Sequence, residues 1–192
     1  MDDKTCRLAF RLNGQEQKAA KITAFDHELA RTRTVTREPM LARIRLEWWR
    51  EAVAEAAGTG RPRAQPIVES LSETSRRHRL TVESLTALID AREEEIEGAL
   101  DVLRAGHALA DLELAVLGID HAPTHQAARA VSAAWLMGEG PEREALLAEA
   151  RALRPEVDPA ALPILLPALS LGGMGAWRKP LAYWWAARRG RY

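Results

Sequence analysis

Apolar residues recur at helical spacing along most of the chain, and the stretch from Arg43 to Val53 adds two adjacent tryptophans. Read as a helix, this stretch carries two neighbouring apolar stripes. One stripe is Leu41, Ile44 and Trp48, and the other is Leu46, Trp49 and Val53. A helix that is apolar around much of its girth has neighbours on more than one side. The pattern therefore predicts a buried helix, with both tryptophans filling the core.

The same periodicity predicts further helices on both sides of this one. The expected ranges are 15–33, 39–57, 67–76, 81–103, 108–117, 124–137 and 142–153. Thr81 is a good N-cap, and Glu83 in the first turn meets the positive end of the helix dipole. Gly106 interrupts the apolar pattern, so we place a break there. Few residues are β-branched, and the whole chain is expected to be helical.

The C-terminal region combines an uncharged run with an aromatic and basic end. Residues 160–177 contain no charge, but prolines and glycines interrupt them, and lipid would leave the freed backbone groups unpaired. We expect an irregular buried or surface-lying segment here. Trp184 and Trp185 precede Arg188, Arg189 and Arg191. Residues 160–192 are therefore a candidate for peripheral membrane contact, and the alternative is a last helix docked on the core.

Composition narrows the class of protein. The 192 residues have a formal net charge of zero, which argues against a nucleic-acid partner, because phosphate contacts need a basic surplus. The single Cys6 fits a reducing compartment. The acidic start of the sequence resembles neither a signal peptide nor a mitochondrial presequence. We expect a cytoplasmic protein, with peripheral attachment to the inner face of a membrane as a second expectation.

Three segments carry a family resemblance. They are AFDHELAR at 24–31, RLEWWR at 45–50 and LIDARE at 88–93. In motif, order and spacing they resemble the squalene/phytoene synthase family, above all its non-classical branch, which includes complex I assembly factors. PLAYWW at 180–185 resembles the C-terminus of that branch. The resemblance is clear over 7–103 and weak over 104–178, and it implies one domain over 1–192.

The resemblance implies an all-α, single-domain bundle of the class I isoprenoid-synthase type, truncated in its C-terminal half. The residues alone support only an all-α chain with a single core. The family's reaction condenses two prenyl diphosphates, with Mg²⁺ held by carboxylates on two facing helices. A protein partner in respiratory complex assembly is what the non-classical branch implies.

The metal motifs of the family are incomplete in this sequence. The first corresponds to residues 26–30, where Asp26 is present but Ala30 supplies no ligand. Asp26 and Glu28 are the candidate metal residues, yet two positions apart they point in different directions on a helix. Their alternative role is a solvated or salt-bridged helix face. No second Asp-x-x-x-Asp motif follows in the C-terminal half.

Arg45 and Arg50, with Trp48 and Trp49, are the candidate substrate-binding residues. Arginine binds phosphate through two parallel hydrogen bonds, but it also stacks on tryptophan and pairs with carboxylate in purely structural roles. Both interpretations stay open, and the structural one is favoured.

The sequence and the family resemblance support two alternative functions. The first is a relative of the synthases that has lost condensation and binds a prenyl lipid, a protein partner or both. No cofactor is then expected. The alternative is an active, Mg²⁺-dependent prenyltransferase of isoprenoid biosynthesis, acting on prenyl diphosphates. The missing carboxylates favour the first.

Overall fold

The computed structural model describes residues 15–35, 38–58, 60–171, 182–183, 185–186 and 192. Over these residues the protein is helical and contains no strand, which confirms the expected all-α class. The main helices are α2 (Gln15–Val35), α3 (Pro39–Ala57), α4 (Pro66–His78), α5 (Val82–Glu97), α6 (Val102–Leu117), α7 (Ala122–Leu136) and α8 (Pro141–Ala152). Three short pieces follow, η1 (Pro159–Ala161), α9 (Leu162–Leu165) and α10 (Pro167–Leu171).

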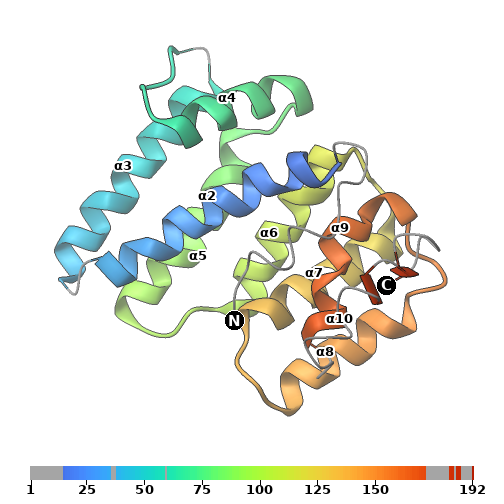
Figure 1. Cartoon of the computed structure of the whole chain (residues 1–192). Coiled ribbons are helices and arrows are strands. Elements are labelled where there is room, and N and C mark those ends of the chain that lie inside the picture. Colours follow the sequence, from blue (N-terminus) through green and yellow to red (C-terminus); the bar gives the residue numbers. More distant parts are fainter. Residues whose placement is uncertain (1–14, 36–37, 59, 172–181, 184, 187–191) are drawn as a thin grey trace.

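Two apolar clusters meet along α6 (Figure 1). The first joins α2 to α5 with one face of α6, and the second joins the other face of α6 to α7, α8 and the C-terminal pieces. Leu112 faces the first cluster and Leu114 the second, and both are fully buried. A helix with neighbours on two sides must be apolar around most of its girth, and α6 has this composition.

α3 is buried on one side only, so the expectation of a helix covered on both sides is wrong. Leu46, Trp49 and Val53 are in the core, with Trp49 only 3% exposed. Leu41 and Ile44 are exposed, and Trp48 is 37% exposed. The second stripe packs on α4 and α5 and on Phe25 of α2, whereas the first stripe remains exposed. Trp48 is therefore not a core residue, although Arg63 lies 4.7 Å from its ring centroid.

The boundary between α5 and α6 also differs from the expectation. The helix that starts after Thr81 ends at Glu97 rather than near Leu103. Asp101 then caps α6 by accepting hydrogen bonds from the backbone N–H groups of Leu103 and Arg104. Gly106 lies inside α6 instead of breaking it. A Cβ at this position would lie 2.4 Å from the backbone nitrogen of Ala133, so glycine here permits close approach of α7.

The C-terminal region is irregular where it is described, as expected. η1, α9 and α10 are short. η1 runs directly into α9, and Leu166 alone separates α9 from α10, which starts at Pro167. No helix in the described part of the chain is both long and apolar enough to cross a bilayer.

The described side chains of the tail lie mainly against the core. Tyr183, Ala186 and Tyr192 are buried in the second cluster. The Tyr192 hydroxyl donates a hydrogen bond to the carbonyl oxygen of Ala150. Burial raises the pKa of Tyr192 to about 12. Residues 172–181, Trp184, Arg188, Arg189 and Arg191 lie outside the described residues, so membrane contact through the tail stays a prediction.

Candidate functional site

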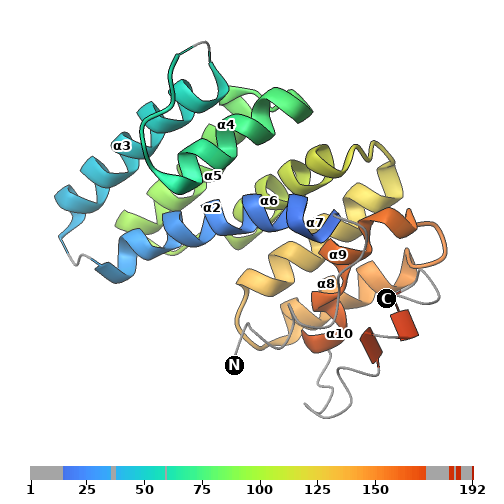
Figure 2. The same ribbon diagram turned by 45° about the horizontal axis from the view of Figure 1, so that its top comes forward.

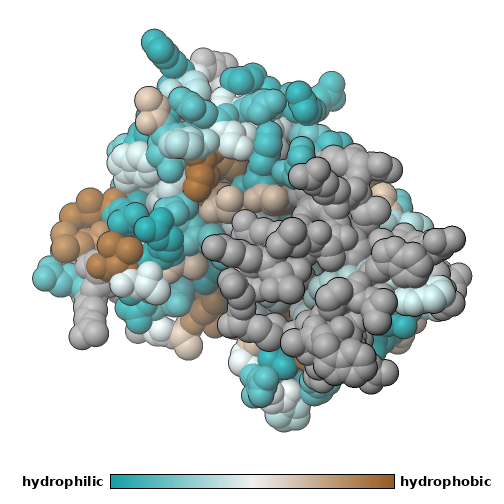
Figure 3. Space-filling view, viewed as in Figure 1, coloured by the Kyte–Doolittle hydropathy of each residue, from teal (hydrophilic) through white to brown (hydrophobic). Residues whose placement is uncertain are grey.

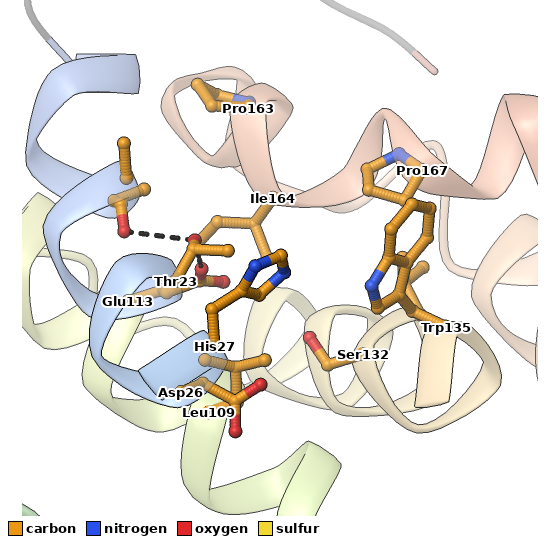
Figure 4. Close-up of a pocket in the computed structure, with 13 residues that line it drawn as sticks. Thr23, Asp26, His27, Leu109, Glu113, Ser132, Trp135, Pro163, Ile164 and Pro167 are labelled. Atoms are coloured by element: carbon orange, nitrogen blue, oxygen red, sulfur yellow. Dashed lines mark hydrogen bonds between the residues drawn. The ribbon is translucent and has the colours of Figure 1, made fainter. Parts of the chain in front are cut away.

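A pocket of about 200 Å³ lies where the two clusters meet (Figure 4). Its walls come from α2, α6, α7 and the α9–α10 region. The lining residues are Ala19, Ala20, Thr23, Asp26, His27, Leu109, Glu113, Val131, Ser132, Trp135, Pro163, Ile164 and Pro167. Figure 2 shows α2 crossing in front of α6 and α7, with α9 beside its N-terminal part.

The pocket is mostly apolar, and its shape follows from residue size. The small side chains of Ala19 and Ala20 on α2 leave space for the pocket, and Ile164 of α9 forms part of its wall. Trp135 is 39% exposed and lies beside Pro167, as Figure 4 shows. No lysine or arginine is among the described residues that line it. An apolar pocket with a few polar groups is typical of a small-molecule site.

Glu113 is the most unusual side chain in this pocket. It is 7% exposed and accepts a 2.8 Å hydrogen bond from the Thr23 hydroxyl. Burial raises the pKa of the Glu113 carboxyl to about 7, with a further contribution from the charge of Asp26, while the Thr23 hydrogen bond acts in the opposite direction. Near neutral pH, Glu113 is therefore present in both protonated and ionised forms.

Thr23 extends this hydrogen bond to the backbone. Its hydroxyl lies 3.2 Å from the carbonyl oxygen of Ala19, one turn earlier in α2. When Glu113 is protonated, it donates to Thr23, which is then free to donate to Ala19. The pocket thus holds a carboxyl group that can switch between donor and acceptor.

Asp26, the first candidate metal residue, forms a buried ion pair with Arg92. Nη2 of Arg92 lies 2.8 Å from Oδ1 and 3.0 Å from Oδ2, and Nε lies 3.1 Å from Oδ1. Both side chains are about 5% exposed. Two-bond pairing of this kind is the strongest carboxylate–arginine geometry. Both carboxylate oxygens of Asp26 accept hydrogen bonds from the guanidinium, and metal binding by Asp26 stays an untested prediction.

Glu28, the second candidate, pairs with Arg31 one turn later on α2, at 2.5 Å. It is not among the residues that line the pocket. Within the described residues, no three His, Cys, Asp or Glu side chains form a group suited to a metal ion.

Arg50 is bound by two carboxylates of α5 and lies away from the pocket. Its Nη2 lies 2.6 Å from Asp90 and 2.5 Å from Glu93. Trp49 packs edge-on against Phe25 with ring centroids 5.5 Å apart. RLEWWR thus supplies a bridge from α3 to α2 and α5. Arg45 is half-buried on the same helix, and neither it nor Trp48 lines the pocket.

The sequence profile of the squalene/phytoene synthase family matches residues 2–114, more than half of the chain. This chain belongs to the squalene/phytoene synthase family. The helical architecture of its described residues agrees with the isoprenoid-synthase-like fold that the family implies. No solved structure shows significant similarity to the sequence.

The curated relatives include two complex I assembly factors. NADH dehydrogenase (ubiquinone) complex I, assembly factor 6 of Rattus norvegicus is 31% identical over 134 residues, which cover 62% of this chain and 40% of the relative. The protein of the same name in Mus musculus is 28% identical over 139 residues, with the same coverage. The chain therefore matches about two fifths of the length of these relatives.

For this member of the squalene/phytoene synthase family, sequence reasoning missed most of the pocket. Asp26 was singled out, but Glu113, Thr23 and Trp135 were not. One signal was available, since Glu113 stands between Leu112 and Leu114 in a helix of mostly apolar residues, which favours burial of its carboxyl. The walls from α7 and α9 lie beyond residue 114, outside the region that matches the family.

Proposed function

We propose that this family member has lost prenyl diphosphate condensation and binds an uncharged prenyl lipid in the pocket between α2, α6, α7 and α9. One observation carries the proposal. The described lining of the pocket is mainly apolar. Its polar members include the carboxyls of Asp26 and Glu113 but no lysine or arginine, and Asp26 is paired with Arg92.

The charges of the pocket disfavour a diphosphate. A diphosphate needs metal ions or guanidinium groups to neutralise it. Arg92 is committed to Asp26, and Arg50 is committed to Asp90 and Glu93. An ionised Glu113 would add repulsion. The candidate substrate-binding residues Arg45, Arg50, Trp48 and Trp49 therefore have no part in this proposal.

An uncharged head group suits the same residues. Protonated Glu113 is a hydrogen-bond donor for a hydroxyl or carbonyl oxygen, and the hydroxyl of Ser132 lies on the facing wall (Figure 4). Ile164, Trp135 and Pro167 offer apolar surface for the prenyl chain. Burial of that chain supplies the main driving force, since it removes apolar area from water.

The relatives support a second part of the proposal. Both are named as assembly factors of complex I. We propose that this chain likewise acts through a protein partner in the assembly of a respiratory complex, with the prenyl ligand bound. The alternative, an active Mg²⁺-dependent prenyltransferase, is retained as an outcome of the test.

Turnover of prenyl diphosphates and occupancy of the pocket are measured in separate experiments. The chain is incubated with farnesyl or geranylgeranyl diphosphate and Mg²⁺, and we expect no squalene or phytoene above a heat-killed control. Product that disappears in Asp26→Ala would establish the enzyme instead. Occupancy is tested with a photoreactive farnesol analogue and peptide mapping, and labelling is expected on α2 and α7.

Two substitutions on α2 provide a matched pair for the labelling. Ala20 and Ala24 are both exposed, but only Ala20 lines the pocket. Ala20→Trp should fill the pocket and abolish labelling, whereas Ala24→Trp should leave it unchanged. Equal labelling of both variants would show that the analogue binds elsewhere.

A further inference from the structure

Five of the eight large exposed apolar side chains of the described residues lie where α2 ends and α3 begins. We call this surface the α2–α3 corner and define it by Val35, Met40, Leu41, Ile44 and Trp48. Met40 is 64% exposed, Ile44 59% and Val35 56%. Figure 3 shows apolar surface gathered at this edge of the molecule. Large apolar side chains that gather in one place usually meet a partner or a lipid.

The α3 residues of the α2–α3 corner form one face of that helix. Met40, Ile44 and Trp48 follow one another at spacings of four, and Leu41 lies next to them. The opposite face of α3 is already used by Trp49 and its neighbours in the core. The exposed face is therefore apolar although its residues belong to neither of the two apolar clusters of the core.

The shape of the corner fits a bilayer. In Figures 1 and 2 the end of α2 and the start of α3 meet at the outer edge and project beyond the helices behind them. A groove-binding partner helix needs a concave apolar surface. A projecting apolar edge enters the interfacial region of a membrane without needing a complementary groove.

The charge around the corner complements an anionic surface. Residues 31–48 contain five arginines and two glutamates, in a chain whose net charge is zero. Arg33 and Val35 are both exposed in the last turns of α2. Basic residues next to an apolar face are the common signature of attachment to anionic lipid.

We propose that the α2–α3 corner docks on the surface of an anionic membrane, with Met40, Leu41 and Ile44 in the interfacial layer and the flanking arginines at the lipid phosphates. This inference does not depend on the prenyl ligand. It also places the contact on a surface different from the C-terminal tail, whose Tyr183 and Tyr192 are buried in the core.

Vesicle flotation of the full chain tests the proposal. We expect the protein to float with phosphatidylcholine vesicles that contain phosphatidylglycerol, to float less with phosphatidylcholine alone, and to be released by salt. The double variant Met40→Asp, Ile44→Asp should bind about tenfold more weakly or worse, because two apolar side chains no longer leave water. Leu103→Asp is the control, since Leu103 is 46% exposed but lies on α6.

The other occupants of the corner give different results. Thermal unfolding first confirms that each variant is folded, which is expected because the substituted side chains are exposed. Loss of flotation in Trp185→Asp with full binding by the corner variant would place the anchor in the tail and overturn the proposal. Sedimentation that shows a dimer dissociated by the corner substitutions would also overturn it, since a second copy would then cover this face.

Discussion

The two apolar clusters that meet at α6 are built by different means. The first, between α2 and α5, contains large side chains such as Phe25 and Trp49, together with the buried Asp26–Arg92 pair. The second relies on alanines of α7 and on the close approach of α7 to Gly106. One cluster is fixed by a few specific contacts, and the other by helices that approach closely over small residues.

This difference bears on the family motifs. AFDHELAR, RLEWWR and LIDARE all lie in the first cluster, where their charged residues bind one another. Asp26 belongs to the segment for which the family resemblance predicted Mg²⁺ binding, and in the structure it is paired with Arg92 of LIDARE. The motifs thus contribute to packing in the first cluster, while the pocket opens at its border with the second.

Removal of Arg92 should have the largest effect. Arg92→Met leaves Asp26 buried and unpaired, and we expect a loss of about 3–5 kcal/mol in the free energy of unfolding. Arg129→Met breaks the half-exposed pair with Asp111 between α6 and α7, and should cost about 1 kcal/mol or less. Chemical denaturation of both variants measures the contrast. Similar losses would mean that the buried Asp26–Arg92 pair stabilises the fold no more than the half-exposed Arg129–Asp111 pair does.

Glu113 should make stability depend on pH. Its pKa is about 7 in the folded chain and lies near 4.5 when unfolded, so the folded state holds more protons between these values. Stability is then highest below about pH 4.5 for this group, falls by roughly 3 kcal/mol as pH rises to 7, and is flat above.

Glu113→Gln removes the titrating group and should flatten this part of the profile. Denaturation midpoints of wild type and variant between pH 5 and about 8 provide the measurement. Parallel profiles would show that Glu113 is ionised in both states across this range.

Gly106→Ala should have the smallest effect of the three and test the second cluster. The added Cβ would lie 2.5 Å from Cα of Ala133, so α6 and α7 must separate. We expect a net loss of about 2 kcal/mol in spite of the better helix propensity of alanine. In Gly138→Ala the Cβ meets no atom within 4 Å, and this control should stay close to wild type. Thermal melting compares the two, and equal midpoints would refute close packing at Gly106.

Helix positions were largely predictable, because periodicity, Pro39 and the Thr81 cap are local signals. The start of α6 was not predicted, because the helix expected after Thr81 continued to residue 103 and the cap at Asp101 was not recognised. Gly106 was read as a breaker, since its reason to be glycine is Ala133, a residue distant in sequence. Local patterns cannot reveal such tertiary contacts.

The two tryptophans show the same limit. Both stripes of α3 are apolar, and nothing local tells which one is covered. The expectation that both tryptophans fill the core is wrong for Trp48. Trp48→Ala should therefore cost about 1 kcal/mol, the scale of its contact with Arg63, whereas Trp49→Ala should cost about 3–5 kcal/mol. The pocket could not be predicted from local patterns either, because its walls come from four segments that are separate in the sequence.

Calorimetric titration with farnesol and with farnesyl diphosphate, each with and without Mg²⁺, tests the central claim most directly. The proposed function predicts that farnesol binds the full chain, that the diphosphate binds more weakly, that Mg²⁺ changes neither, and that Ala20→Trp abolishes farnesol binding while Ala24→Trp does not. Tighter binding of the diphosphate that requires Mg²⁺ and is lost in Asp26→Ala would contradict it, because the Asp26–Arg92 pair would then have to open to form a metal site.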